Sequence, residues 1–186
     1  MATGSSGLIH RRVQVSGTAS RPGPGVYLDV TEAGVRQDGG APVVLCHGFP
    51  ESAYSWRHQL PALAAAGYHV LAPDQRGYAR SSRPANVTEY GIDQLCGDLL
   101  ALLDDVGAEQ GVFVGHDWGA LIVWELAKLF PERVKAVVGV SVPFVMWPGR
   151  PTELMKMLYG DRFFYILYFQ QVGPPEAELE ADPRRT

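Results

Sequence analysis

The segment at residues 111–130 reads GVFVGHDWGALIVWELAKLF and joins a short apolar run to a longer segment through a compact turn. Residues 111–116 are mostly apolar and β-branched or aromatic, which predicts a strand. Residues 118–130 predict a helix that Pro131 stops, because proline cannot continue a helix. Gly115 and Gly119 flank Asp117 and allow a sharp bend. The segment therefore predicts a strand, a tight turn and a helix.

The same alternation extends on both sides of this segment. Apolar runs predict further strands at 42–46, 68–74 and 135–142. Helical patterns lie between strands at 56–66 and 92–106. Continuous β-branched runs are typical of parallel strands buried on both faces. The pattern predicts an α/β fold whose mostly parallel sheet has helices on both faces. Ahead of it, segments 9–15 and 26–31 predict two strands joined by the turn-rich residues 16–25.

Composition and charge narrow the class of protein. The chain has 186 residues, a formal net charge of -4 and two cysteines, Cys46 and Cys96. An acidic balance argues against a nucleic-acid partner, which usually requires a basic face. The cysteines have neither a disulfide framework nor metal-ligand spacing, and nothing in the sequence calls for a cofactor. With no signal-peptide core at the start and no apolar run long enough to span a membrane, we expect a cytoplasmic protein.

The turn at residues 115–119, GHDWG, matches the G-x-S-x-G spacing that carries a serine nucleophile, with Asp117 in the serine position. A carboxylate has a reference pKa of about 3.9, so it is an anion at neutral pH and needs no base. Its attack on an ester would give a reactive anhydride, whereas attack on a saturated carbon gives an alkyl ester that water can cleave. Epoxides and alkyl halides are the electrophiles that fit. The alternative is that Asp117 only caps the following helix.

A tetrahedral intermediate on Asp117 requires backbone N–H donors. Trp118, the residue after the nucleophile, is expected to supply one and Phe49 in the HGFP segment (47–50) the other, since Pro50 has no N–H. His47 is expected to hold this loop through a hydrogen bond rather than act as a base. Trp118 is interpreted as a pocket wall, with a core aromatic as the alternative. Both turns follow predicted strands, at the sheet edge where ligands bind.

Four segments in order resemble the epoxide hydrolases of the α/β-hydrolase superfamily: 47–84, 115–120, 133–144 and 163–186. The resemblance covers the chain from about residue 26 to its end. It implies an α/β-hydrolase fold that is incomplete at the C-terminus. Residues 1–143 would form the N-terminal part of the core, and residues 144–186 the start of a helical cap domain.

The resemblance also implies roles for individual residues. Asp117 would be the nucleophile, and Phe49 and Trp118 would provide the oxyanion N–H groups. Tyr165 matches a cap tyrosine that hydrogen-bonds the epoxide oxygen, with Tyr168 as a rival and simple aromatic packing as the alternative. The substrate would be a small hydrophobic epoxide, opened to a vicinal diol, with water as the second reactant.

Some positions depart from the family pattern. Ala79 stands where glycine is usual, so its turn is strained if the backbone needs a positive φ. In the superfamily a nucleophile is followed by an acid and then a histidine, yet no histidine follows Asp117 here, and no relay acid is placed after the strand at 135–142. We therefore expect at most one round of alkylation from this chain alone. An unprotected last strand would also favour poor solubility or self-association, unless another chain supplies the remainder.

Three other interpretations remain open at this point. A haloalkane dehalogenase would use the same aspartate, but it often has a side-chain amide beside the oxyanion loop, where Phe49 stands. Tyr165 suits an oxygen leaving group better than a halide. The fragment could instead bind a small apolar ligand or a partner chain without catalysis, or it could be an incomplete reading frame.

Overall fold

The computed structural model describes residues 7–16, 21, 23, 25–37, 39–146, 149–182 and 184. By their contacts the residues divide into two compact units, Met1–Phe144 and Val145–Thr186. The division falls beside the boundary expected after residue 143. That the second unit begins a cap domain stays a prediction.

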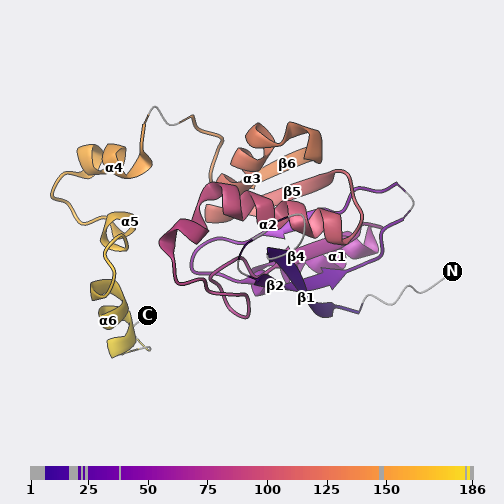
Figure 1. The fold of residues 1–186 in the computed structure, drawn as a ribbon, viewed down its shortest axis with the longest axis horizontal. Coiled ribbons are helices and arrows are strands. Elements are labelled where there is room, and N and C mark those ends of the chain that lie inside the picture. Colours follow the sequence, from indigo (N-terminus) through magenta and orange to yellow (C-terminus); the bar gives the residue numbers. More distant parts are fainter. Residues whose placement is uncertain are drawn as a thin grey trace. The chain divides into compact units, whose positions relative to one another are not determined.

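Within the described residues of the first unit, six strands form one sheet in the order β1-β2-β4-β3-β5-β6 (Figure 1). The strands are β1 (Ile9–Ser16), β2 (Val26–Ala33), β3 (Val43–Cys46), β4 (Val70–Pro73), β5 (Gly111–His116) and β6 (Val134–Val140). β1 pairs antiparallel with β2 and β2 antiparallel with β4, while β4, β3, β5 and β6 run parallel. The mostly parallel sheet and the β1–β2 strand pair are as predicted. Part of the β1–β2 connection, at 17–20, 22 and 24, lies outside the described residues.

Helices α1 (Gln59–Ala65), α2 (Ile92–Asp105) and α3 (Trp118–Leu129) lie between the strands in sequence. The prediction that the first helix begins at Trp56 is wrong: Ala53–Trp56 forms a separate 3₁₀ turn, and α1 starts three residues later. The cause is Pro61, which has no N–H to donate to the carbonyl of Arg57 and whose ring would crowd it. The predicted end of α3 before Pro131 is confirmed, since Phe130 leaves the helical conformation at φ -135° and ψ 56°.

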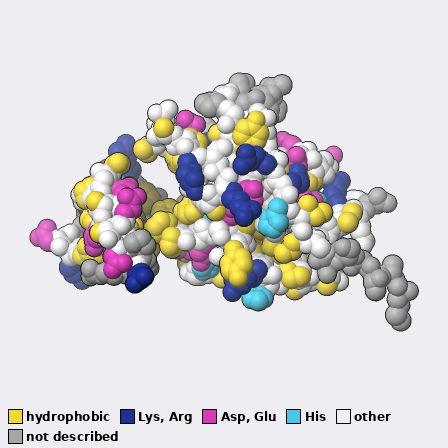
Figure 2. All heavy atoms as spheres, turned by 90° about the horizontal axis from the view of Figure 1, so that it is seen from below, with side chains coloured by type: hydrophobic (Ala, Val, Ile, Leu, Met, Phe, Trp, Pro, Cys, Tyr) yellow, Lys and Arg dark blue, Asp and Glu magenta, His cyan; other side chains and the backbone are white. Residues whose placement is uncertain are grey.

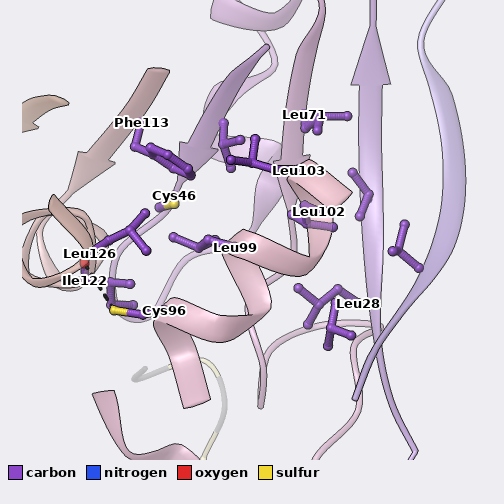
Figure 3. Packing of buried hydrophobic residues seen from close by; sticks show 14 of the residues in the cluster. Leu28, Cys46, Leu71, Cys96, Leu99, Leu102, Leu103, Phe113, Ile122 and Leu126 are labelled. Carbon is purple, nitrogen blue, oxygen red and sulfur yellow. Dashed lines mark hydrogen bonds between the residues drawn. The ribbon is translucent and has the colours of Figure 1, made fainter. Parts of the chain in front are cut away.

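Two hydrophobic cores cover the two faces of the sheet. Alternate residues of β3 point in opposite directions: Val44 and Cys46 join the core under α2 and α3, whereas Val43 and Leu45 join the core with Leu60 of α1. Figure 3 shows the larger core, in which leucines of α2 and α3 pack toward the sheet from one side. Its fully buried side chains include Leu99, Leu102, Leu103, Phe113 and Leu126. Helices on both faces are therefore confirmed.

Strand β6 is not buried on both faces, although its apolar run is typical of such a strand; it is the unprotected last strand that was also expected. It has a neighbour on one side only within the described sheet, and Val138 and Val140 are 47% and 42% exposed. The opposite face is covered by α3, where the Trp124 ring lies so close to Gly139 that a Cβ there would be 2.5 Å away. The strand ends at Val140 rather than at residue 142, because Ser141 adopts a φ of 65° that a strand cannot accommodate.

The second unit is helical in short pieces, as predicted. It contains α4 (Pro151–Tyr159), α5 (Tyr165–Tyr168) and α6 (Pro174–Ala181). Tyr159 and Phe164 stack with ring centroids 4.0 Å apart and planes within 5°. Contacts between aromatic rings therefore connect α4 with the start of α5.

The surface carries charges of both signs. On the face drawn in Figure 2, lysine and arginine side chains stand among acidic, histidine and apolar ones and do not merge into one basic surface. Among the described residues, no helix is both long enough and apolar enough to cross a membrane.

Candidate active site

The candidate site forms where two neighbouring parallel strands end. β3 and β5 are paired with Cys46 opposite Gly115, so the chain leaves both strands at the same edge of the sheet. β3 leads into residues 47–50 and β5 into the turn that carries Asp117. Phe49 and Asp117, 68 positions apart in the sequence, thereby come into contact at the edge where parallel sheets bind ligands.

The backbone of Asp117 is held in an unusual conformation. Its φ of 53° and ψ of -118° lie outside the regions that residues with side chains commonly adopt. Such a conformation costs on the order of 1–3 kcal/mol and is often found at functional sites. The carbonyl of Asp117 accepts the Ala120 N–H at 3.0 Å, but its side chain makes no capping bond to α3. The alternative in which the Asp117 side chain only caps the helix is therefore wrong.

The glycines on both sides of Asp117 are required by close backbone contacts. A Cβ on Gly115 would lie 2.2 Å from the carbonyl oxygen of Gly119, and a Cβ on Gly119 would lie 2.2 Å from the carbonyl oxygen of Cys46. A residue with a side chain at either position would therefore collide with the backbone. The predicted tight turn, with α3 packed closely against the end of β3, is confirmed.

The carboxylate of Asp117 is oriented by the loop after β3. The Phe49 N–H donates to Oδ1 of Asp117 at 3.0 Å. Gly48 lies against the same side chain, since a Cβ there would be 2.6 Å from Asp117 Cβ and 2.8 Å from Oδ1. One carboxylate oxygen is thus bound by a backbone N–H, which leaves Oδ2 as the oxygen that can approach a substrate.

His47 is fully buried beneath this loop and bonds through both ring nitrogens. Nε2 accepts the Gln75 N–H at 2.9 Å, so the ring hydrogen is on Nδ1, which donates to the Gly48 carbonyl at 2.8 Å. Burial lowers the pKa of His47 below its ordinary value, so the ring is neutral at neutral pH. The Tyr78 ring packs edge-on against it at 4.9 Å. These contacts fit the expected role of holding the loop.

Glu51 links the loop to the end of β5. Its Oε2 accepts the Gly48 N–H at 3.1 Å, and its Oε1 lies 3.3 Å from Nδ1 of His116. Partial burial acts to raise the pKa of Glu51, but the Gly48 N–H and His116 outweigh it and lower the pKa below its ordinary value. A carboxylate can only accept, so Nδ1 of His116 is the donor. The Nδ1 hydrogen of His116 is therefore engaged by the Glu51 carboxylate.

Trp118 borders a cavity of about 390 Å³ in the first unit. Its side chain is 40% exposed, so the alternative of a core aromatic is wrong. As the first residue of α3, it presents an N–H without a partner inside the helix. Tyr78 also borders this cavity, and its pKa is raised by burial and by the charge of Asp117. The remaining lining residues are Gln75, Arg76, Tyr90, Ile92, Leu95, Leu121 and Ile122.

Tyr165 belongs to the second unit. It begins α5, is 42% exposed and contacts the rings of Phe164 and Phe169 at 5.4 and 6.1 Å. Its rival Tyr168 donates its hydroxyl proton to Glu178 at 2.7 Å, and this bond is the main cause of a raised Tyr168 pKa. Tyr168 is therefore already engaged as a donor, and the role of Tyr165 stays a prediction.

Three residues of the site were not anticipated from the sequence. Glu51, Gln75 and Tyr78 act through contacts that only the folded chain creates: Gln75 and Tyr78 follow β4, which lies next to β3 in the sheet. A signal was present for Glu51, because an acidic side chain three residues after Gly48 can reach back to its N–H. Across the described part of the chain, no group of three or more His, Cys, Asp or Glu side chains could hold a metal ion.

Comparison with known proteins agrees with this geometry. Residues 41–163 match the family model described as alpha/beta hydrolase fold. Epoxide hydrolase A of Mycobacterium tuberculosis is 58% identical over 164 residues, which are 87% of this chain and 50% of that protein. Bifunctional epoxide hydrolase 2 of Sus scrofa is 47% identical over 88% of this chain and 29% of its own length.

Solved structures show the same similarity. The crystal structure of epoxide hydrolase A from Mycobacterium thermoresistibile has a TM-score of 0.87 and 54% identity, covering 97% of this chain and 54% of that one. An epoxide hydrolase from an endophytic Streptomyces has a TM-score of 0.85 and 42% identity. The chain spans about half the length of these structures and half or less of the sequence relatives above.

Proposed function

The chain belongs to the α/β-hydrolase fold family, and within it we propose that the chain carries the nucleophilic half of an epoxide hydrolase. The reaction would open an epoxide to a vicinal diol through an ester on Asp117. The observation that carries this proposal is the Asp117 carboxylate, which sits on a strained turn and is held by the Phe49 N–H at 3.0 Å. The similarity to named epoxide hydrolases supports the choice of electrophile.

In the first step, Oδ2 of Asp117 attacks a ring carbon of the epoxide. A carbon–oxygen bond to the enzyme forms as the ring carbon–oxygen bond breaks, and the released electron pair stays on the former ring oxygen. Tyr165 would donate its phenolic proton to that oxygen. A well-placed proton donor of this kind typically contributes about 10²–10⁴-fold in rate.

In the second step, water adds to the carbonyl carbon of the Asp117 ester, and negative charge develops on the carbonyl oxygen. The N–H groups of Phe49 and Trp118 would stabilise this charge. In the ground state Phe49 already donates to Oδ1, so Oδ1 is the oxygen expected to become the oxyanion. When the intermediate collapses, the bond between the acyl carbon and Oδ2 breaks and Oδ2 leaves as a hydroxyl oxygen of the diol. One proton of the water passes to this oxygen and the other would restore Tyr165, while the water oxygen stays in the regenerated carboxylate.

The expected substrate is a small hydrophobic epoxide. The cavity beside Trp118 is lined by the neighbour of Asp117 and not by Asp117 itself, and its apolar side chains would contact an aryl or alkyl substituent that extends past Trp118. These side chains are Ile92, Leu95, Leu121 and Ile122. Its volume of about 390 Å³ is in the range of small-molecule pockets. Water is the second reactant, and the proposed steps use no cofactor.

The experiment that tests this function is covalent capture. No histidine follows Asp117 in the 186-residue chain, so the chain by itself is expected to form the ester and hydrolyse it slowly. Incubation with an aryl epoxide should add one substrate mass per chain, and the Asp117→Ala variant should add none. Formation of diol through many turnovers would contradict the expected single round, and reversible binding without an adduct would support a non-catalytic binder.

Substitution of the two cap tyrosines separates their roles. Tyr165→Phe should slow adduct formation at least about 10²-fold if its proton is used. Tyr168→Phe is the matched control, since it removes an identical group from the same helix, and it should change the rate less than about twofold.

Halide release from a bromoalkane, with no reaction of the epoxide, would instead support a haloalkane dehalogenase.

Self-association and location are part of the same proposal. β6 presents Val138 and Val140 on an edge strand of the described sheet, and exposed apolar edges promote pairing between chains. Light scattering during size exclusion should therefore detect species larger than one chain.

A cytoplasmic location is supported by the unpaired, buried state of Cys46 and Cys96. Cell fractionation would test it.

A further inference from the structure

Gly48 is the glycine of the loop that holds Asp117. It has no side chain because a Cβ would collide with Asp117, and glycine is the residue whose backbone is least restricted. The direction of the Phe49 N–H therefore depends on how the two peptide groups flanking Gly48 are fixed. Each of these peptide groups is bound by a different side chain.

His47 fixes the peptide group between Gly48 and Phe49. This peptide is trans, so its C=O and N–H point in opposite directions. Nδ1 of His47 binds the C=O at 2.8 Å, and the N–H consequently points toward Oδ1 of Asp117 at 3.0 Å. The bond from His47 to the Gly48 carbonyl therefore orients the Phe49 N–H, which lies on the other side of the same peptide group.

Glu51 fixes the preceding peptide group, between His47 and Gly48. Its Oε2 accepts the N–H of this peptide group, the Gly48 N–H, at 3.1 Å. The backbone N–H of Glu51 donates to the Gly48 carbonyl at 3.1 Å and so binds, together with His47, the following peptide group. The same carboxylate lies 3.3 Å from His116, the residue that precedes Asp117. Glu51 therefore bridges the loop that supplies the N–H and the strand that supplies the carboxylate.

We infer that Glu51 is a positioning residue, which sets the alignment of the Phe49 N–H with Asp117 by binding Gly48 and His116 at once. This inference rests on the proposed function, because the aligned carboxylate is the nucleophile of that reaction. Glu51 does not touch the reacting atoms. Its effect passes through the backbone of Gly48 and through the side chain of His116.

The test compares three variants. Glu51→Ala removes the acceptor for the Gly48 N–H and the partner of His116. Glu51→Gln keeps an acceptor oxygen and loses the charge. Glu125→Ala is the matched control, because Glu125 is also a partly exposed carboxylate with a side-chain partner, Lys128 at 2.8 Å on α3, and has no contact with the loop among the described interactions.

Two readouts are measured on the full chain, alongside thermal unfolding. Amide hydrogen exchange at Gly48 and Phe49, followed by NMR, reports the order of the loop without any chemistry. Glu51→Ala should speed it at least about tenfold, because the opening of a local segment becomes easier. The rate of adduct formation on Asp117 with an aryl epoxide should fall about tenfold, since small misplacements of reacting groups have effects of this size or larger.

Glu51→Gln should return both quantities to within about threefold of the unsubstituted chain, and Glu125→Ala should change neither. Equal effects of Glu51→Ala and Glu125→Ala, or unchanged exchange at Gly48 and Phe49 in Glu51→Ala, would overturn the inference. If the unsubstituted chain forms no adduct, the proposed function fails, while the exchange measurement still decides the role of Glu51.

Discussion

Adding a single methyl group at Gly48 should disable the nucleophile while leaving the fold intact. A Cβ at this position would lie 2.6 Å from Asp117 Cβ, whereas an ordinary contact begins near 3.4 Å. The loop and Asp117 must therefore separate by at least about 0.8 Å, the difference between these two distances. The hydrogen bond from Phe49 to Oδ1 now measures 3.0 Å, and a displacement of this size along it would exceed hydrogen-bond length.

The expected consequence is a large loss of reactivity with a moderate loss of stability. A misplacement of about 1 Å can lower a rate by about 10²-fold, so Gly48→Ala should alkylate Asp117 about 10²-fold more slowly with an aryl epoxide. Overpacking of this kind lowers the free energy of unfolding by about 1–3 kcal/mol. The assay is intact mass against time, with urea unfolding measured in parallel.

The matched control is Gly25→Ala, where the nearest atom to a Cβ is the Tyr27 ring at an ordinary 3.6 Å. This variant should keep the alkylation rate of the unsubstituted chain. Gly48→Ala reacting at that same rate, in a folded state, would refute the argument that the loop orients the carboxylate.

The remaining predictions concern stability and thiol reactivity. Asp98→Ala should lower the free energy of unfolding by about 3–5 kcal/mol in urea titrations, because Asp98 and Arg76 are 2.6 Å apart with side chains 4% and 1% exposed, and the change leaves the buried Arg76 charge without its carboxylate. A loss below about 1 kcal/mol would count against this. Ala79→Gly should raise the free energy of unfolding by about 0.5–1 kcal/mol. The φ of 40° destabilises the folded state with alanine by more than the extra chain entropy of glycine would stabilise the unfolded state. An unchanged thermal unfolding temperature would argue that the turn is not strained. Neither Cys46 nor Cys96 should react with a thiol reagent before unfolding, because both are buried and burial raises the pKa of Cys96 to about 12; labelling of the native chain would contradict their burial.

Most of the fold follows from local sequence patterns. The six strands and three principal helices of the first unit lie close to their expected positions because apolar periodicity and proline act locally. The differences arise where one residue decides the backbone: Pro61 delays α1, and the positive φ of Ser141 ends β6 early. The exposure of β6 is a property of the whole sheet, which the apolar run of the strand does not encode.

The candidate site was predictable where a motif fixes the backbone. Asp117, Phe49 and His47 lie in two short segments whose spacing implies a turn and a loop, and the structure brings them together. The contact of Glu51 with the Gly48 N–H is local, but the role of Glu51 was missed because its second contact, with His116, is to another strand. Such a contact depends on the pairing of β3 with β5, which no local pattern reveals.

The measurement that bears most directly on this account is the location of a covalent adduct. After incubation with an aryl epoxide, the chain would be digested and the modified residue identified by mass spectrometry. We predict one adduct per chain, as an ester on Asp117, and none in Asp117→Ala. An adduct on another residue, or one that persists undiminished in Asp117→Ala, would contradict the central role of this carboxylate.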